Sequence, residues 1–174
     1  MAFYLSQNGK ARPFFFDYIK EAGVKRIEKT LVKGKKKKKA PFIPDKIHFV
    51  TEIMSRKIIF LTPHASLKEA QKIFKTKKIH HLVILMDGVL KGLLSDRDFI
   101  KHSLKKNTAD IPISKVMAKL VLSASDSTSI EDIALVMIKE DISALPIVGD
   151  ELELLGIVTR SDVLKWVVNK SYLK

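Results

Sequence analysis

The pattern of apolar and polar residues predicts the same series of secondary-structure elements twice along this chain. One series covers residues 50–104 and the other covers residues 113–168, and the two align end to end with one inserted residue. Matching positions are 63 residues apart up to the central strand and 64 apart after it. A repeat of this length is typical of one supersecondary unit used twice. Two such units normally face each other, so a site on one repeat is expected to have a counterpart on the other.

Each repeat contains three short apolar runs that predict β-strands. These runs are Ile58–Leu61, Leu82–Met86 and Val89–Leu94 in the first repeat, and Val121–Leu122, Leu145–Val148 and Leu154–Val158 in the second. A turn signal, Asp87-Gly88 or Gly149-Asp150, separates the second strand from the third. The second and third strands are therefore expected to pair as a hairpin.

Two helices are predicted in each repeat. The first begins after Ser66, with Glu69 three residues on, and its counterpart begins after Ser129, with Asp132 at the same spacing, as in a capping box. The second helix begins where the third strand ends, so the order is β-α-β-β-α. Two helices cover only one face of such a three-stranded sheet. We therefore expect an α+β fold in which the two repeats pack through the other faces of their sheets with pseudo-two-fold symmetry.

The N-terminal part of the chain matches neither repeat. The predicted domains are a basic N-terminal extension at 1–46, the first repeat at 47–109 and the second repeat at 110–172. Asn8-Gly9 between apolar residues predicts a hairpin. Residues 14–19 are equally typical of a helix that begins after Pro13 and ends at Gly23, and both interpretations stay open. The run Lys35–Lys39 is expected to be an exposed linker, because adjacent lysines repel one another.

Composition narrows the classes of function. The chain has 174 residues, 46% of them hydrophobic, and no cysteine, which excludes disulfides and thiolate metal sites. Its net charge of +13 is unevenly distributed, with +9 in residues 1–46, +7 in residues 47–109 and −3 in the remainder. Such a field favours anionic partners. The chain starts without the apolar core of a signal peptide and has no run long enough to span a bilayer, so we expect a soluble cytoplasmic protein without a membrane partner.

Both repeats end in the motif Gly-apolar-apolar-Ser/Thr-x-x-Asp, at Gly92–Asp98 and Gly156–Asp162. Its hydroxyl stands where a strand turns into a helix, where it can cap the helix or bind a phosphate. A carboxylate one turn later can accept hydrogen bonds from the paired hydroxyls of a ribose. An adjacent arginine adds a positive group near any phosphate. The same spacing is also that of ordinary helix capping, which contributes about 1 kcal/mol or less.

These motifs and the hairpin before each of them resemble the cystathionine-β-synthase (CBS) domain, and the duplication is similar to a CBS pair, or Bateman module. Residues 142–148 match the central strand of the family, whereas the first repeat has Val83 where the family usually has proline. Ile53-Met54 and Val116-Met117 match its opening. The resemblance covers residues 47–170, about 70% of the chain.

The resemblance implies a regulatory binding module and not an enzyme. In this family the cleft between the repeats takes adenine nucleotides or related adenosyl compounds, and binding modulates a partner protein. We therefore expect AMP, ADP, ATP or S-adenosylmethionine as ligand, no required cofactor, and a homodimer. The expected binding residues are Ser95, Arg97, Asp98, His80, His81 and Leu82 in the first repeat, and Thr159, Arg160, Asp162, Ser143, Ala144 and Leu145 in the second. The residues do not decide which repeat carries the better site.

Two other functions compete with this one. The protein could be a nucleic-acid-binding protein in which Lys35–Lys39 belong to a basic arm and the repeats form a dimerising scaffold. It could also be a structural interaction module without a ligand. A metal site at His80-His81 is not expected, because adjacent strand residues point to opposite faces. Trp166 is expected in the core or an interface, and no nucleophile with an adjacent base or paired-acid arrangement supports catalysis.

Overall fold

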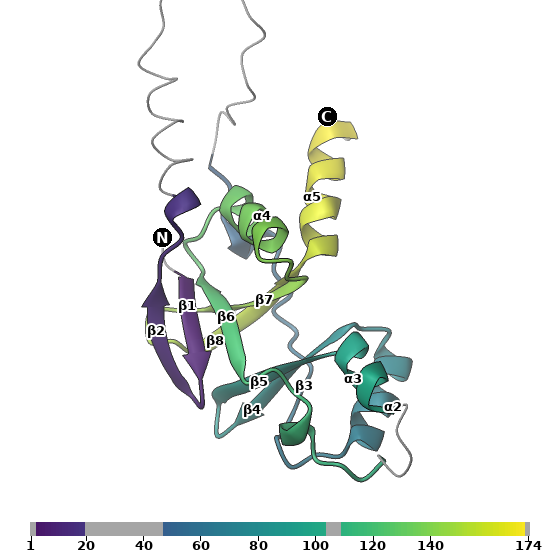
Figure 1. The fold of residues 1–174 in the computed structure, drawn as a ribbon. Coiled ribbons are helices and arrows are strands. Elements are labelled where there is room, and N and C mark those ends of the chain that lie inside the picture. Colours follow the sequence, from purple (N-terminus) through teal and green to yellow (C-terminus); the bar gives the residue numbers. More distant parts are fainter. Residues whose placement is uncertain (1–2, 20–46, 104–108, 173–174) are drawn as a thin grey trace, which may run out of the picture.

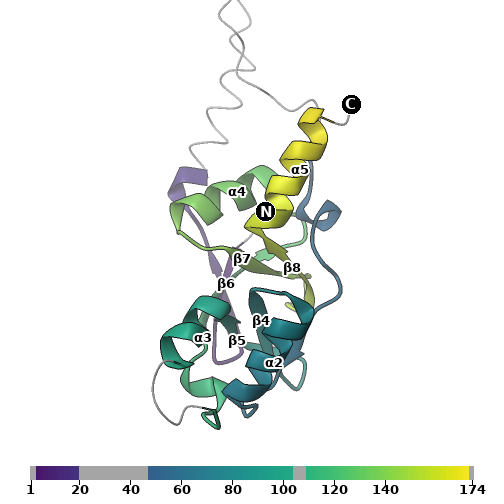
Figure 2. The same ribbon diagram turned by 90° about the vertical axis from the view of Figure 1, so that its right-hand side faces the viewer.

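The computed structural model describes residues 3–19, 47–103 and 109–172, and it confirms the α+β fold with two repeats. Figures 1 and 2 show one repeat below the other, with the sheets meeting in the middle and the helices on the outside. Between the sheets lies an apolar cluster around Val83, Leu90 and Val121. The face of each sheet that its own helices do not cover is therefore covered by the other repeat, as the pattern predicts.

The two repeats contain the same elements in the same order. The first repeat contains β3 (Phe60–Leu61), α2 (Leu67–Lys77), β4 (His81–Met86), β5 (Val89–Ser95) and α3 (Asp96–Ser103). The second contains β6 (Leu120–Ser125), α4 (Ile130–Lys139), β7 (Ala144–Val148), β8 (Leu154–Thr159) and α5 (Arg160–Tyr172). In each, the first strand runs parallel to the second and the second runs antiparallel to the third. A register shift interrupts both hairpins at matching positions, after Ile84 and after Ile147.

The predicted helix starts are confirmed. Ser66 caps α2, its hydroxyl accepting from the Glu69 amide at 3.3 Å, while the Glu69 carboxylate accepts from the Ser66 amide at 2.7 Å. Ser129 caps α4 by accepting from the Asp132 amide at 3.1 Å. Each cap satisfies a backbone donor that the helix itself leaves free.

The N-terminal extension forms part of the second repeat's sheet. Its hairpin, β1 (Phe3–Gln7) and β2 (Lys10–Phe14), turns at Asn8 and Gly9, both with positive φ. β1 pairs antiparallel with β6, giving a five-stranded sheet in the order β2-β1-β6-β7-β8. The hairpin interpretation is therefore confirmed, and residues 17–19 are helical. Gly23 and Lys35–Lys39, on which the other predictions for this segment rest, lie outside the described residues.

The segments that lead into the repeats are exchanged between them. Val50, in the short helix η1 (Val50–Glu52), donates to Thr128 O at 2.9 Å and is buried in the core of the second repeat. Ile113, in η2 (Ile113–Lys115), donates to Ala65 O at 2.8 Å and is buried in the core of the first repeat. Each core is therefore completed by the lead-in segment of the other repeat.

The motif glycines allow this exchange. A Cβ at Gly156 would lie 2.9 Å from Met54 Sδ and 2.9 Å from Ser55 O, and a Cβ at Gly92 would lie 2.6 Å from Met117 Sδ. Real Cβ atoms essentially never show contacts this short. The glycine of the closing motif and the methionine of the opening motif are thus two sides of one contact, in which the lead-in segment crosses a strand of the other repeat.

Two further features concern the outer helices. Trp166 of α5 is partly buried, and its ring centroid lies 5.5 Å from that of His48 at the start of the first lead-in segment. This contact places Trp166 at a packing interface, as predicted. Within the described residues, no helix combines the length and apolar character that crossing a membrane requires.

Candidate functional site

A cleft of about 800 Å³ lies between the two repeats. Three segments supply most of its wall: Ser55, Lys57 and Ile59 in the first lead-in, Lys78 to His81 at the entry to β4, and Thr159 to Asp162 at the start of α5. Ser95 to Arg97, at the start of α3, add a further part of the wall. The cleft therefore collects strand entries from the first repeat and helix starts from both.

The cleft brings together eight of the twelve residues expected to bind ligand. These are Ser95, Arg97, His80, His81, Thr159, Arg160, Asp162 and Ser143. Three of the other four are buried inside strands: Leu82 and Leu145 are fully buried, and Ala144 is 6% exposed. The fourth, Asp98, is partly exposed on α3 but is not among the described residues that line the cleft.

Both motif hydroxyls are paired with the aspartate of their own motif. Ser95 Oγ donates to Asp98 Oδ2 at 2.6 Å, and Thr159 Oγ1 donates to Asp162 Oδ2 at 2.6 Å. The Thr159 amide donates to the same Asp162 oxygen at 2.9 Å. Helix capping is therefore one role of both motifs. The second Asp162 oxygen, 3.9 Å from Lys165 Nζ, retains capacity to accept hydrogen bonds from a ligand.

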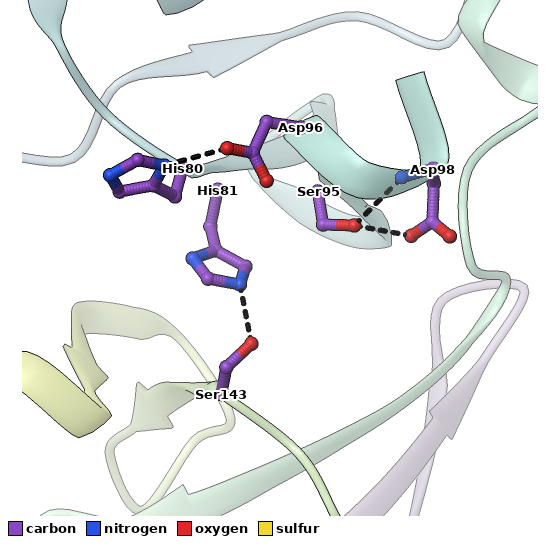
Figure 3. Close-up of polar contacts among 6 residues, drawn as sticks. All are labelled: His80, His81, Ser95, Asp96, Asp98 and Ser143. Carbon is purple, nitrogen blue, oxygen red and sulfur yellow. Dashed lines mark hydrogen bonds and ion pairs between the residues drawn. The ribbon is translucent and has the colours of Figure 1, made fainter. Parts of the chain in front are cut away.

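Two histidines stand at the entry to β4 with different partners (Figure 3). His81 Nε2 forms a hydrogen bond with Ser143 Oγ at 2.9 Å, which joins the two repeats across the cleft. Burial is the main cause that lowers the pKa of His81 below its ordinary value of 6.5, so this imidazole is neutral at pH 7. His80 Nδ1 lies 2.6 Å from Asp96 Oδ2.

Arg160 lines the cleft, but its guanidinium is held by the end of α4. Its Nε donates to Ile142 O at 2.8 Å, and one terminal nitrogen donates to Met137 O at 3.0 Å and to Asp141 Oδ1 at 2.8 Å. The hydrogen bond and the charge of Arg160 hold the pKa of Asp141 below its usual value. Arg160 therefore serves first to anchor the start of α5 to the end of α4.

The matching positions in the first repeat carry the opposite charges. Lys78 stands where the second repeat has Asp141, and Asp96 stands where it has Arg160. Lys78 and Asp141 share a left-handed backbone, with φ of 51° and 49°. Asp96 contacts His80 instead, and Lys78 lines the cleft.

The charge of the cleft lining is positive. Its basic residues are Lys57, Lys78, Arg97, Arg160 and Lys165, and its acidic residues are Asp96 and Asp162. Within the described residues, the side chains of Lys57, Lys78 and Arg97 make no hydrogen bond or ion pair. A concave surface with this excess attracts anions. The described residues contain no group of three or more His, Asp or Glu side chains that could hold a metal ion.

Sequence reasoning missed the lead-in part of the wall, namely Ser55, Lys57 and Ile59. Ser55 and Lys57 precede the strand predicted over Ile58–Leu61, and Ile59 lies in the part of that prediction that the structure does not form as strand, since β3 is Phe60–Leu61. The repeat alignment holds a signal, because Lys57 matches Leu120 and Lys78 matches Asp141. A lysine whose matching position in the other repeat carries an uncharged or acidic residue is a candidate for a role that only one repeat performs.

Comparison with known proteins shows which family these features define. The CBS domain family matches residues 50–105 and 113–169, the two repeats. The chain therefore belongs to the CBS-domain proteins. The CBS domain-containing protein YhcV of Bacillus subtilis is 30% identical over 115 residues, covering 66% of this chain and 81% of that protein. The uncharacterized protein MJ1225 of Methanocaldococcus jannaschii is 28% identical over an alignment of 134 residues, covering 70% of this chain and 48% of that protein.

Two solved structures with the same fold contain adenosyl compounds. The CBS domain pair of protein MJ0100, in complex with 5′-methylthioadenosine and S-adenosyl-L-methionine, matches with a TM-score of 0.66 and 31% identity, covering 72% of this chain and all of that one. CBSX2 in complex with AMP matches with a TM-score of 0.64 and 25% identity, covering 71% of this chain and 98% of that one.

Proposed function

We propose that this protein is a regulatory module that binds an adenine nucleotide in the cleft between its two CBS repeats and thereby modulates a partner protein. The observation that carries the proposal is the composition of the cleft wall. The Asp162 carboxylate, at the start of a helix, faces a wall that carries cations without partners within the described residues. The complexes of similar CBS pairs with AMP and with adenosyl compounds support this class of ligand.

The wall offers a suitable surface for each part of a nucleotide. Ile59 and Ile157 supply apolar surface for a base. The Asp162 oxygen that does not accept from Thr159 suits a ribose hydroxyl, and Lys57, Lys78 and Arg97 suit phosphates. The cleft volume of about 800 Å³ is within the usual range for small-molecule sites. The positive lining favours phosphorylated nucleotides over S-adenosylmethionine, whose sulfonium carries a positive charge.

The position of the cleft between the two repeats offers a route to regulation. A ligand that contacts both repeats shifts the protein toward the arrangement that it binds more tightly, by no more than the difference in affinity.

We propose that a second copy of the chain or a partner protein binds this arrangement preferentially. The exposed apolar residues of α5, Leu164, Val167 and Val168, support an association between copies. Sedimentation of the full chain tests it, and a monomer at every concentration contradicts it.

Thermal unfolding in the presence of AMP, ADP, ATP, S-adenosylmethionine, NAD and GTP tests the ligand class. A compound at 100 times its dissociation constant stabilises the protein by about 2.7 kcal/mol. We expect adenine nucleotides to raise the midpoint, GTP to do so much less, and the Asp162→Asn variant to lose the response relative to its own ligand-free midpoint. The exposed Asp150→Asn variant, outside the cleft, is the matched control. If no compound changes the midpoint, the proposed function is wrong.

The nucleic-acid function stays a prediction. It rests on Lys35–Lys39, which lie outside the described residues. Binding of a nucleic acid that weakens steeply with salt and is lost on removal of residues 1–45 would support it.

A further inference from the structure

The repeated motifs imply two equivalent ligand sites, but the cleft is not symmetric. Its strand-side wall comes from Ser55–Ile59 and Lys78–His81 of the first repeat. The matching residues of the second repeat are 118–122 and 141–144. Of these, only Ser143 is among the described residues that line the cleft. On the helix side, Asp162 lines the cleft and Asp98 does not.

The N-terminal hairpin accounts for part of this asymmetry. β1 pairs with the edge of β6, so that Leu5 lies opposite Leu122 and Gln7 lies opposite Leu120. The matching edge of the first repeat, residues 57–59, is not a paired strand and borders the cleft. The backbone edge that the first repeat offers to a ligand is therefore occupied by β1 in the second.

The turn of the same hairpin lies against the first repeat. A Cβ at Gly9 would lie 2.9 Å from Lys91 Nζ and 2.9 Å from Val89 Cγ1, both on β5. The hairpin thus contacts both sheets, pairing with β6 and touching β5. A ligand that used the second-repeat wall would need to displace it and to break the antiparallel pairing of β1 with β6.

Charge is a second and independent difference. The first-repeat wall carries Lys57 and Lys78, and the matching residues in the second repeat are Leu120 and Asp141. An acidic and an apolar residue in place of two cations disfavour a phosphate at the second wall. The two motif carboxylates themselves have equivalent partners: Asp98 accepts from Ser95 at 2.6 Å and lies 3.7 Å from Lys101 Nζ, and Asp162 accepts from Thr159 at 2.6 Å and lies 3.9 Å from Lys165 Nζ. Figure 3 shows Asp98 on the far side of Ser95 from His80 and His81.

We propose that each chain binds one nucleotide and not two. Asp162 contacts its ribose, and Lys57 and Lys78 of the first-repeat wall contact its phosphates. Asp98, despite its identical motif, acts only at the start of α3. This inference rests on the proposed function and adds to it the number of sites and the residues that determine specificity for a phosphorylated ligand.

Isothermal titration of the full chain with ATP and, separately, with AMP tests the inference. We expect one nucleotide per chain, loss of binding in Asp162→Ala, and affinity within about twofold of wild type in the matched Asp98→Ala variant. Lys57→Leu and Lys78→Ala, at exposed positions, should each weaken ATP binding by about tenfold, or about 1.4 kcal/mol, through loss of a charged contact with a phosphate. The exposed Lys68→Ala, outside the cleft, should bind ATP as the wild type does.

The possible failures are distinguishable. Two nucleotides per chain, or loss of binding in Asp98→Ala with binding kept in Asp162→Ala, overturns the single-site inference and leaves the proposed function intact. Unchanged ATP affinity in both lysine variants overturns the assignment of the phosphates to the first-repeat wall. No binding of either nucleotide to the wild type overturns the proposed function and this inference together.

Discussion

The two repeats follow one plan, yet they differ at the edge of the sheet and in the charge beside it. In the second repeat β6 has six residues and is paired on both sides, by β1 and β7. In the first repeat β3 has only two residues and is paired on one side, by β4. Pairing with β1 explains the longer strand, because a strand with partners on both edges satisfies more of its backbone groups. The shared core preserves the fold, and the edges distinguish what each repeat can bind.

The charged positions follow the same division. The second repeat uses Arg160 and Asp141 to join the start of α5 to the end of α4. The first repeat carries Asp96 and Lys78 at these positions, but Asp96 contacts His80, and Lys78 lines the cleft. A structural ion pair in one repeat thus corresponds to a cleft cation in the other. Duplicated units can in this way keep one scaffold and divide its roles.

Truncating a lead-in residue that is buried in the core of the other repeat should destabilise the protein most. Ile113→Ala should destabilise the protein by about 2–5 kcal/mol, because it leaves a cavity in the core of the first repeat. Val50→Ala, which removes fewer carbons from the core of the second, should cost less. Urea unfolding measures both, and the control is Ile138→Ala, at a position 75% exposed, with about 0.5 kcal/mol or less. Similar losses in Ile113→Ala and Ile138→Ala would show that the lead-in segment does not complete the core.

The contacts at the motif glycines should give the next largest effect. Gly92→Ala and Gly156→Ala should each destabilise the protein by about 1–3 kcal/mol, because the added methyl group overlaps the lead-in segment of the other repeat. The loss should be greater for Gly92→Ala, whose contacts of 2.6 and 2.8 Å are the shorter ones. Urea midpoints of the two variants test this order. Wild-type stability in both variants would mean that the added methyl groups do not overlap the lead-in segments.

The two serines that cap α2 and α4 differ in their burial. Ser129→Ala and Ser66→Ala should each cost about 0.5–2 kcal/mol through loss of a cap. Ser129 should be at the upper end, because Ser129 and Asp132 are each 2% exposed, whereas Ser66 is partly exposed to water. Urea unfolding of the two variants side by side gives the difference. An equal or larger loss at Ser66 would contradict the role of burial.

The smallest effect concerns the histidine that joins the repeats. Because the pKa of His81 is lower in the folded protein than its ordinary 6.5, the unfolded chain takes up a proton that the folded chain does not. Above pH 6.5 the titration of His81 does not change the free energy of unfolding. As the pH falls through 6.5 it lowers that free energy, and below the pKa of His81 in the folded protein the loss grows no further. His81→Gln should reduce the fall in urea midpoint between about pH 7.5 and 5. A fall as steep as that of the wild type would exclude His81 as its source.

Local patterns sufficed for most elements of the fold. The capping residues Ser66 and Ser129 and the turn at Asp87-Gly88 determine backbone geometry within a few residues, so sequence alone located the α-helices and hairpins of the two repeats, but not the short helices η1 and η2. The N-terminal segment was ambiguous because Asn8-Gly9 and the residues after Pro13 favoured different structures. In the structure the hairpin ends at Phe14, after pairing through β1 with the distant β6, and residues 17–19 are helical.

The candidate site was less predictable because its asymmetry is tertiary. The motifs at Asp98 and Asp162 are equivalent in sequence, and both form the same local cap. The positions of β1 and of the lead-in segments distinguish their surroundings, together with the opposite charges of Lys78 and Asp141. Nothing in the apolar character of Ile113 indicates whose core it joins. The wall containing Lys57 therefore required the structure, although the mismatch with Leu120 was visible in the sequence.

The exchange of lead-in segments also governs how the chain can fold during synthesis. Residues emerge from the ribosome in order, and domains generally fold as units as they emerge. The first repeat cannot close its core until Ile113 has emerged, and Val50 must wait for Val158, with which it shares a core. Contacts so distant in sequence slow folding. A nascent chain that stops after the first repeat therefore exposes apolar surface, the feature by which chaperones and proteases recognise unfinished proteins.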